Sequence, residues 1–181
     1  MDVKTTALPG VLLIRPRVFG DERGFFLETF SAERYRDQAG IDLPFVQDNH
    51  SRSRRGILRG LHFQRAHPQG KLVSVARGLV YDVAVDIDPD SPTCGRYVGA
   101  ELSDANHWQL WIPPGYAHGF CVLSDEADFT YKCTDYYRPG DEGGLAWNCP
   151  RVAIDWPLDD PQLSVRDSAY PGLDALLAER R

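Results

Sequence analysis

Two short stretches of this 181-residue chain carry side chains that can exchange protons and hold negative charge. Residues 59–64 read RGLHFQ and residues 69–73 read QGKLV, and a turn containing Pro68 joins them. The imidazole of His62 has an unperturbed pKa near ~6.5, so it can take and return protons at neutral pH, and the ammonium of Lys71 can hold negative charge that develops during a reaction. This pair predicts proton abstraction.

A third group of reactive side chains lies at residues 129–137, which read FTYKCTDYY. Two interpretations of Tyr131 are open. It is a buried aromatic residue whose hydroxyl finds a partner, or it is an acid that faces the base His62 across a cavity. The presence of both His62 and Lys71 in the same chain favours the acid.

The segments that must position these side chains are predicted to be mostly strands. Besides the two stretches above, runs rich in β-branched and aromatic residues are bounded by Gly, Pro, Asp or Asn. They span residues 11–19, 24–30, 71–77, 79–88, 97–102, 109–112, 118–123 and 128–135. Their short connections imply a β-sandwich or barrel. Two helices are expected, one at residues 32–39 with Ser31 as N-cap and Gly40 as the stop, and one at residues 173–181.

Alternation along the strand predicted at residues 79–88 puts two carboxylates, Asp82 and Asp86, on one face. Burying two carboxylates without partners is costly, so this face is either wet or meets cations such as Lys71. Both alternatives describe a barrel with a polar interior.

Several arginines precede His62 in the sequence. For three of them a solvated loop and a site for a small phosphorylated ligand are both open interpretations: Arg52, Arg54 and Arg55. Arg59 lies in the same stretch as His62 and is expected to be functional. Since simple alternation would place Arg59 and His62 on opposite faces of their strand, we expect Gly60 to mark a bulge or twist if both serve one site.

The composition fits a single domain, residues 1–181, that is large enough to bury roughly 70% of its unfolded surface. The four cysteines form no CxxC pair, which favours reduced thiols, and no run of ~18 apolar residues predicts a membrane span. We therefore expect a soluble cytoplasmic protein. The formal net charge of −6 argues against a general nucleic-acid binder.

Residues 112–120 read IPPGYAHGF, and their Pro-x-Gly-x-x-His spacing resembles the second motif of cupin barrels. Cupin metal sites also need a His-x-His pair followed by a carboxylate, and no second histidine lies two residues from His62. Three or four protein ligands cannot be assembled from these motifs, so no metal is expected. His50, His67 and His107 are expected to be surface or structural residues.

The ordered motifs of the chain resemble those of the dTDP-4-dehydrorhamnose 3,5-epimerase family. The matching runs are residues 21–26, 47–51, 59–64, 70–73, 82–86, 91–93, 111–120, 131–132 and 163–167. They follow the order of the family and cover about residues 8–170. The resemblance implies an all-β, cupin-type jelly-roll barrel with a few short peripheral helices. It also implies a homodimer that exchanges N-terminal strands, a dTDP-sugar substrate, and no metal or organic cofactor.

The resemblance also implies residue roles. His62 would be the base, oriented by Asp167, with Tyr131 as the acid on the opposite face of the sugar and Lys71 stabilising the enolate oxygen at C4. The substrate site, some of it supplied by the partner subunit, would contain Arg23, Glu28, Gln47, Asn49, Arg59, His118, Tyr137, Glu142 and Arg166. Tyr137 would stack on the thymine, and Arg166 stands where the family commonly has Lys.

The implied reaction converts dTDP-4-dehydro-6-deoxy-D-glucose to dTDP-4-dehydro-L-rhamnose by inversion at C3 and C5, on the route to dTDP-L-rhamnose. An epimerase of the same family that acts at one carbon is the alternative. A metal-dependent cupin oxygenase and a non-catalytic sugar-binding module are more remote. Two departures from the family pattern, Asp88 for an Arg and Cys149 for an Asp, leave the proposed catalytic set intact.

Overall fold

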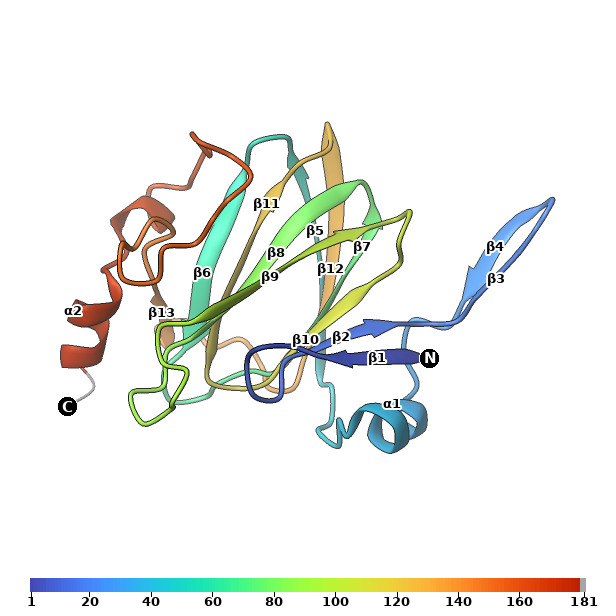
Figure 1. Ribbon diagram of the computed structural model, residues 1–181, viewed down its shortest axis with the longest axis horizontal. Helices are drawn as coiled ribbons and strands as arrows, with labels where there is room; N and C mark the ends of the chain where they lie inside the picture. Colours follow the sequence, from blue (N-terminus) through green and yellow to red (C-terminus); the bar gives the residue numbers. More distant parts are fainter. Residues whose placement is uncertain (180–181) are drawn as a thin grey trace.

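Two β-sheets face each other in the computed structural model, which describes residues 1–179 (Figure 1). One sheet contains β1 (Asp2–Thr5), β2 (Leu12–Arg15), β5 (Gln47–Arg54), β7 (Lys71–Arg77), β10 (Gln109–Ile112) and β12 (Glu126–Cys133). The other contains β6 (Leu58–Gln64), β8 (Leu79–Asp86), β9 (Tyr97–Ser103), β11 (Tyr116–Val122) and β13 (Glu142–Gly144). The first has the order β1-β2-β10-β7-β12-β5 and the second the order β13-β6-β11-β8-β9, with neighbouring strands antiparallel. The predicted all-β fold is confirmed.

The main hydrophobic core lies between the two sheets. Its buried members from the six-stranded sheet include Val73, Val75, Leu110, Ile112 and Phe129, and those from the five-stranded sheet include Val80, Ala84, Leu102, Phe120 and Val122. The strands that form this core contribute alternate residues to it, as expected for a pleated strand with one face inside. These apolar side chains fill only part of the space between the two sheets, and polar side chains line the other part.

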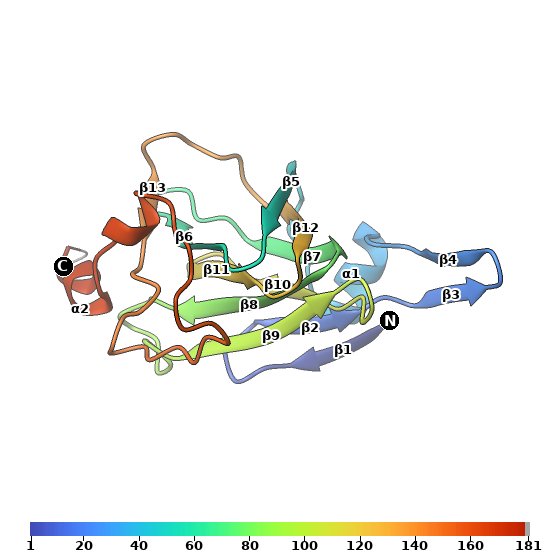
Figure 2. The same cartoon turned by 90° about the horizontal axis from the view of Figure 1, so that it is seen from above.

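The outer faces of the sheets are covered by the helices and the C-terminal segment (Figures 1 and 2). Helix α1 (Ala32–Ala39) begins and ends as predicted: the hydroxyl of Ser31 accepts from the backbone N–H of Arg34, and Gly40 has a φ of 68°. Helix α2 (Leu173–Ala178) follows a 3₁₀ turn, η1 (Asp167–Ala169). The last two residues of the predicted second helix, 180–181, lie outside the described residues. No helix within residues 1–179 is long and apolar enough to cross a membrane.

The strand predicted at residues 11–19 is divided in the structure. It ends at Arg15 and resumes as β3 (Val18–Asp21), because Pro16 has no N–H to continue the ladder. β3 pairs with β4 (Gly24–Leu27) in a two-stranded hairpin that projects from the body of the molecule (Figures 1 and 2). The strand predicted at residues 24–30 is therefore shorter than expected.

The edge strands β1, β5 and β13 were not predicted from the sequence. β5 reads QDNHSRSR, which has no apolar alternation, yet all eight of its residues pair with β12. Every second residue from Gln47 to Ser51 is half-buried while its neighbours are exposed. The inner face of β5 borders a polar cavity. Polar residues therefore occupy both faces of this strand, and its sequence shows no alternation of apolar and polar residues.

Candidate active site

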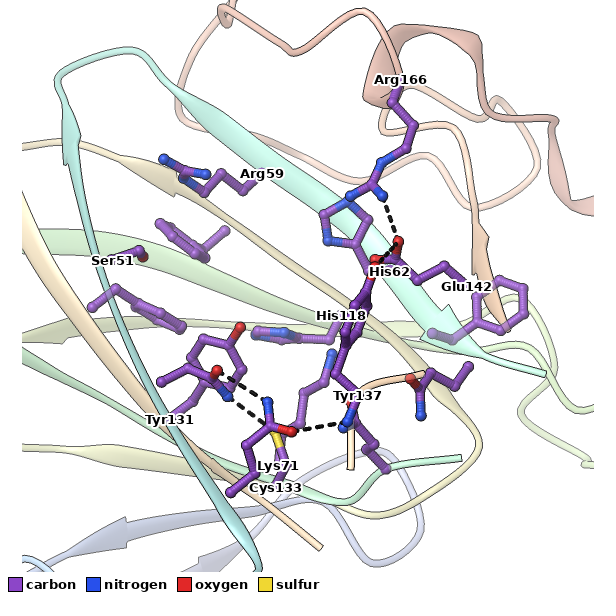
Figure 3. Close-up of a pocket in the computed structure, with 17 residues that line it drawn as sticks. Ser51, Arg59, His62, Lys71, His118, Tyr131, Cys133, Tyr137, Glu142 and Arg166 are labelled. Atoms are coloured by element: carbon purple, nitrogen blue, oxygen red, sulfur yellow. Dashed lines mark hydrogen bonds and ion pairs between the residues drawn. The ribbon is translucent and has the colours of Figure 1, made fainter. Parts of the chain in front are cut away.

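A cavity of about 320 Å³ opens between the two sheets and is lined largely by polar and charged side chains (Figure 3). Its lining residues are Gln47, Asn49, Ser51, Arg59, His62, Phe63, Gln64, Gln69, Lys71, His118, Phe120, Phe129, Tyr131, Cys133, Tyr137, Glu142 and Arg166. The structure thus brings together ten of the thirteen residues predicted for the site.

One wall of the cavity comes from neighbouring strands of the six-stranded sheet. Tyr131 on β12 lies opposite Asn49 on β5, and Cys133 lies opposite both Gln47 on β5 and Lys71 on β7. Residues two apart on a strand share a face, so these five side chains point to the same side of the sheet. Strand alternation therefore places the phenol of Tyr131 and the ammonium of Lys71 on the same wall of the cavity.

The facing wall depends on a bulge in β6. His62 pairs with His118 and Arg59 pairs with Phe120, so three steps along β6 match two steps along β11. The extra residue reverses the alternation, and both Arg59 and His62 line the cavity. Gly60 has a φ of 126°, and a Cβ on it would lie 2.6 Å from a backbone carbon of β11. The bulge predicted at Gly60 is confirmed, and only glycine fits there.

His62 is bonded to a carboxylate that is distant in sequence. Its Nε2 lies 2.7 Å from Oδ1 of Asp167, which belongs to η1 and is 5% exposed. Burial by itself raises the pKa of Asp167, but the bonds from His62, Ser164 and the backbone of Gly60 outweigh it and hold that pKa below its ordinary value. An ionised carboxylate can only accept, so Nε2 donates and Nδ1 is the basic nitrogen.

Burial also changes the chemistry of the opposite wall. It lowers the pKa of Lys71, whose ammonium makes no hydrogen bond or ion pair within residues 1–179. Burial raises the pKa of Tyr131, which keeps the phenol protonated and able to donate. The cavity therefore contains a base with a carboxylate behind it, an uncommitted cation and a neutral acid.

The two carboxylates of β8 are both satisfied inside the protein. Asp82 accepts from Nε2 of His118, at 2.9 Å and 3.1 Å to its two oxygens. Asp86 instead accepts from the hydroxyls of Ser91 and Thr93, each at 2.5 Å. Neither carboxylate is wet, since Asp82 is 0% and Asp86 3% exposed, and the imidazole of His118 and two hydroxyl groups act as donors where a cation such as Lys71 was expected.

His118 also bears on metal binding. Burial lowers its pKa although Asp82 opposes the shift, and its Nε2 is committed to that carboxylate. Residues 1–179 contain no group of three or more His, Cys, Asp or Glu side chains arranged to hold a metal ion.

At the mouth of the cavity one carboxylate joins two loops. The hydroxyl of Tyr137 donates to Oε2 of Glu142 at 3.0 Å, and Arg166 forms an ion pair with the same oxygen (Figure 3). The backbone N–H of Tyr137 donates to Oε1 of Gln47 at 2.9 Å. These bonds hold an exposed aromatic ring beside the opening.

Comparison with known proteins identifies this arrangement. The family model described as dTDP-4-dehydrorhamnose 3,5-epimerase matches residues 5–175. The chain belongs to this family. A dTDP-4-dehydrorhamnose 3,5-epimerase of Salmonella typhimurium is 53% identical, with 99% of this chain and 100% of the relative covered. A crystal structure of a dTDP-6-deoxy-D-glucose-3,5-epimerase from Legionella pneumophila in complex with dTDP-4-keto-L-rhamnose superposes with a TM-score of 0.95 at 53% identity, covering 98% of this chain and 95% of that one.

The family includes a relative named for one carbon. A dTDP-4-dehydrorhamnose 3-epimerase of Streptomyces niveus is 40% identical over 100% of this chain and 86% of the relative. The relative from Salmonella is more similar and is named for both carbons. The comparisons confirm the cupin-type jelly roll and do not favour the single-carbon alternative.

Three predicted site residues do not line the epimerase cavity. Asp167 lies behind His62, as its expected orienting role requires. Arg23 and Glu28 lie on or beside the projecting hairpin instead, where Arg23 pairs with Asp21 at 2.5 Å and Glu28 pairs with Arg34. The single chain does not bring Arg23 and Glu28 to the cavity.

Several other residues singled out in the sequence have structural partners. Arg52 makes two 2.8 Å bonds to Asp128, which His50 also contacts. Arg55 pairs with Asp125 on the surface, so the solvated interpretation holds for it. The ring of His107 packs on Phe25, and the backbone N–H of His67 donates to Asp141. The Sγ of Cys149 accepts from the backbone N–H of Leu173 at the start of α2, and Asp88 accepts from the backbone N–H of Asp90 in its own turn.

Four polar residues that line the cavity were not assigned to the site from the sequence: Ser51, Gln64, Gln69 and Cys133. Strand alternation contained the signal for three of them, since each lies two residues beyond a predicted site residue on the same strand, namely Asn49, His62 and Tyr131. Gln69 precedes β7, and its amide bonds to the backbone of Asp135, a contact with no local sequence signal.

Proposed function

We propose that this protein acts as a dTDP-4-dehydrorhamnose 3,5-epimerase, an isomerase that converts dTDP-4-dehydro-6-deoxy-D-glucose to dTDP-4-dehydro-L-rhamnose through the residues of this cavity. The observation that carries the proposal is the bonded pair of His62 and Asp167 on one sheet's side of the cavity, with Tyr131 and Lys71 on the wall formed by the other sheet. This arrangement supplies a base, an acid and a cation around one space.

The ketone at C4 of the substrate acidifies the hydrogens on C3 and C5. Nδ1 of His62 removes one of them, and Asp167 stabilises the imidazolium that forms. The electron pair of the broken C–H bond moves to the C4 oxygen as an enolate. The ammonium of Lys71, which forms no hydrogen bond or ion pair within residues 1–179, donates to that oxygen.

Reprotonation then inverts the carbon. The phenol of Tyr131 delivers a proton to the face opposite His62, and the enolate electrons return to the carbon as the new C–H bond forms. Solvent reprotonates the tyrosinate and takes the proton from the imidazolium, so the cycle closes without redox change. The sugar presents its second acidic carbon to the same base for the second inversion.

The cavity also offers partners for the nucleotide. The guanidinium of Arg59, held at 2.8 Å by the hydroxyl of Ser53, and that of Arg166 at the mouth suit the charge of a diphosphate. The ring of Tyr137 stacks on the thymine. The remaining proposed contacts are Gln47, Asn49, His118 and Glu142.

Arg23 and Glu28 reach a substrate from a second copy of the chain. Supporting this part of the proposal, the hairpin β3–β4 projects from the body and exposes three large apolar residues: Phe19, Phe25 and Phe26, at 49%, 62% and 68%. Such a group in a projecting element is suited to cover by another subunit. A homodimer that exchanges its N-terminal strands would bring each hairpin to the partner's cavity.

Proton exchange in deuterated water tests the reaction. Incubation with dTDP-4-dehydro-6-deoxy-D-glucose should place deuterium at both C3 and C5, because each inversion replaces a carbon-bound hydrogen with one from an exchangeable donor. Coupling to a nicotinamide-dependent 4-ketoreductase should then yield dTDP-L-rhamnose. Label and inversion at one carbon alone would overturn the proposal in favour of a single-carbon epimerase. Tyr131→Phe should abolish inversion while His62 still exchanges protons on its own face.

A further inference from the structure

We infer that Tyr170 is a positioning residue for the base of this enzyme, holding the imidazole of His62 through its ring and not through its hydroxyl. The inference rests on the role proposed for His62. The ring centroids of His62 and Tyr170 are 5.8 Å apart with an interplanar angle of 77°, an edge contact between the two rings. Tyr170 does not line the cavity, so it contacts His62 from behind.

The imidazole needs a second restraint besides Asp167. The single hydrogen bond at Nε2 and the covalent bond at the other end of the side chain leave the ring free to rock about the line that joins them. Rocking moves Nδ1, the nitrogen that must reach the substrate hydrogen. An aromatic edge against the side of the ring limits that motion.

Tyr170 is itself fixed in place by close packing. A Cβ built on Gly144 would lie 2.3 Å from three atoms of the Tyr170 ring, so the ring lies directly over the backbone at Gly144. Gly144 is the register partner of His62 across β13 and β6. The adjacent backbone is anchored because the N–H of Ala146 donates to the carbonyl of Pro171 at 2.8 Å. One short segment thus delivers both Asp167 and Tyr170 to the same imidazole.

The hydroxyl of Tyr170 does not explain this placement. Its oxygen is buried and has no hydrogen-bond partner within residues 1–179. A buried hydroxyl without a partner is destabilising, so its removal should do no harm. Removing the ring of Tyr170 and removing only its hydroxyl are therefore expected to have different effects on the enzyme.

Two substitutions separate these contributions. Tyr170→Ala should lower kcat by about 10-fold or more with KM within about 2-fold, since it loosens the base without touching the substrate. Tyr170→Phe keeps the ring and removes only the hydroxyl, so it should have the wild-type kcat and a higher Tm than the wild type. Val165→Ala is the matched control, because Val165 lies on the same segment and is 89% exposed. It should leave kcat unchanged.

Proton NMR of the free enzyme supplies a readout that does not depend on turnover. The Nε2–H of His62, bonded to Asp167, should give a downfield resonance that His62→Ala removes. Tyr170→Ala should broaden or abolish this resonance while Tyr170→Phe preserves it. A Tyr170→Ala variant with normal kcat and an unchanged resonance would overturn the inference, as would a Tyr170→Phe variant as slow as Tyr170→Ala. Full activity of His62→Ala would instead overturn the proposed base.

Discussion

Replacing Asp167 by Asn changes the proposed catalytic dyad of His62 and Asp167 by a single group and leaves its shape intact. The carboxylate accepts from Nε2 of His62 at 2.7 Å and also from the backbone N–H of Gly60. An asparagine has only one acceptor oxygen. When that oxygen accepts from Gly60, the NH₂ group faces Nε2, which must then become an acceptor. The proton moves to Nδ1, so the imidazole points its N–H at the substrate and cannot act as a base.

The size of the effect follows from two limits. If the amide oxygen still faces His62, only charge assistance is lost: a hydrogen bond to a charged group contributes ~1.5–3 kcal/mol and a neutral one ~0.5–1.5 kcal/mol. That difference of about 1–2 kcal/mol lowers kcat roughly 5- to 30-fold. If the wrong tautomer dominates, the whole contribution of the base is lost, roughly 10²–10⁴-fold. The bond to Gly60 favours the second limit, so we expect a loss of at least about 100-fold.

Turnover and binding must be measured separately to test this reasoning. Asp167→Asn should lower kcat in the coupled 4-ketoreductase assay and leave the affinity for dTDP, measured by calorimetry, within about 2-fold, because Asp167 does not line the cavity. Asp160→Asn, the same change at an exposed carboxylate, is the control and should match the wild type. A variant that loses nucleotide binding but keeps its rate per bound substrate would refute the dyad and make Asp167 a ligand contact.

Three further predictions concern charges in and around the barrel. Lys71→Met should abolish turnover and raise the urea midpoint of unfolding, because it removes an ammonium group that is costly to bury, as its lowered pKa indicates. A lower urea midpoint would show that the ammonium has a stabilising partner. Asp128→Asn should be less stable than the wild type at neutral pH, since the bonds from Arg52 and His50 hold the pKa of Asp128 well below its ordinary value. That stabilisation is present above the pKa that Asp128 has in the unfolded chain and is lost as Asp128 becomes protonated. The difference in denaturant midpoint between the wild type and Asp128→Asn should therefore narrow progressively below about pH 5. A difference that stays constant with pH would contradict the ion pair. Exhaustive chelation should leave activity unchanged, since the Nε2 of His118 is committed to Asp82; a rate restored by one added divalent ion would refute metal-independent turnover.

The helix and most central strands could be predicted because their signals are local. Ser31 and Gly40 mark the ends of α1 by their own capping chemistry, and apolar alternation marks the strands that form the core. β5 escaped prediction because its inner face borders a polar cavity, so the apolar half of the usual alternation is missing. The break at Pro16 was available in the sequence, since proline lacks the N–H that a continuous strand needs.

The amino-acid types and their order are enough to predict which reactive groups this protein carries: a base, an acid, a cation and, through the resemblance of its ordered motifs, their assignment to one epimerase site. How these groups meet depends on contacts between segments that are distant in the chain. Asp167 lies 105 residues from His62, and no local pattern specifies a contact across that separation. The bulge at Gly60 turns Arg59 to the face of His62 because strand pairing with β11 absorbs the extra residue there. The contact between Tyr170 and His62 likewise exists only because the C-terminal segment folds back over β13.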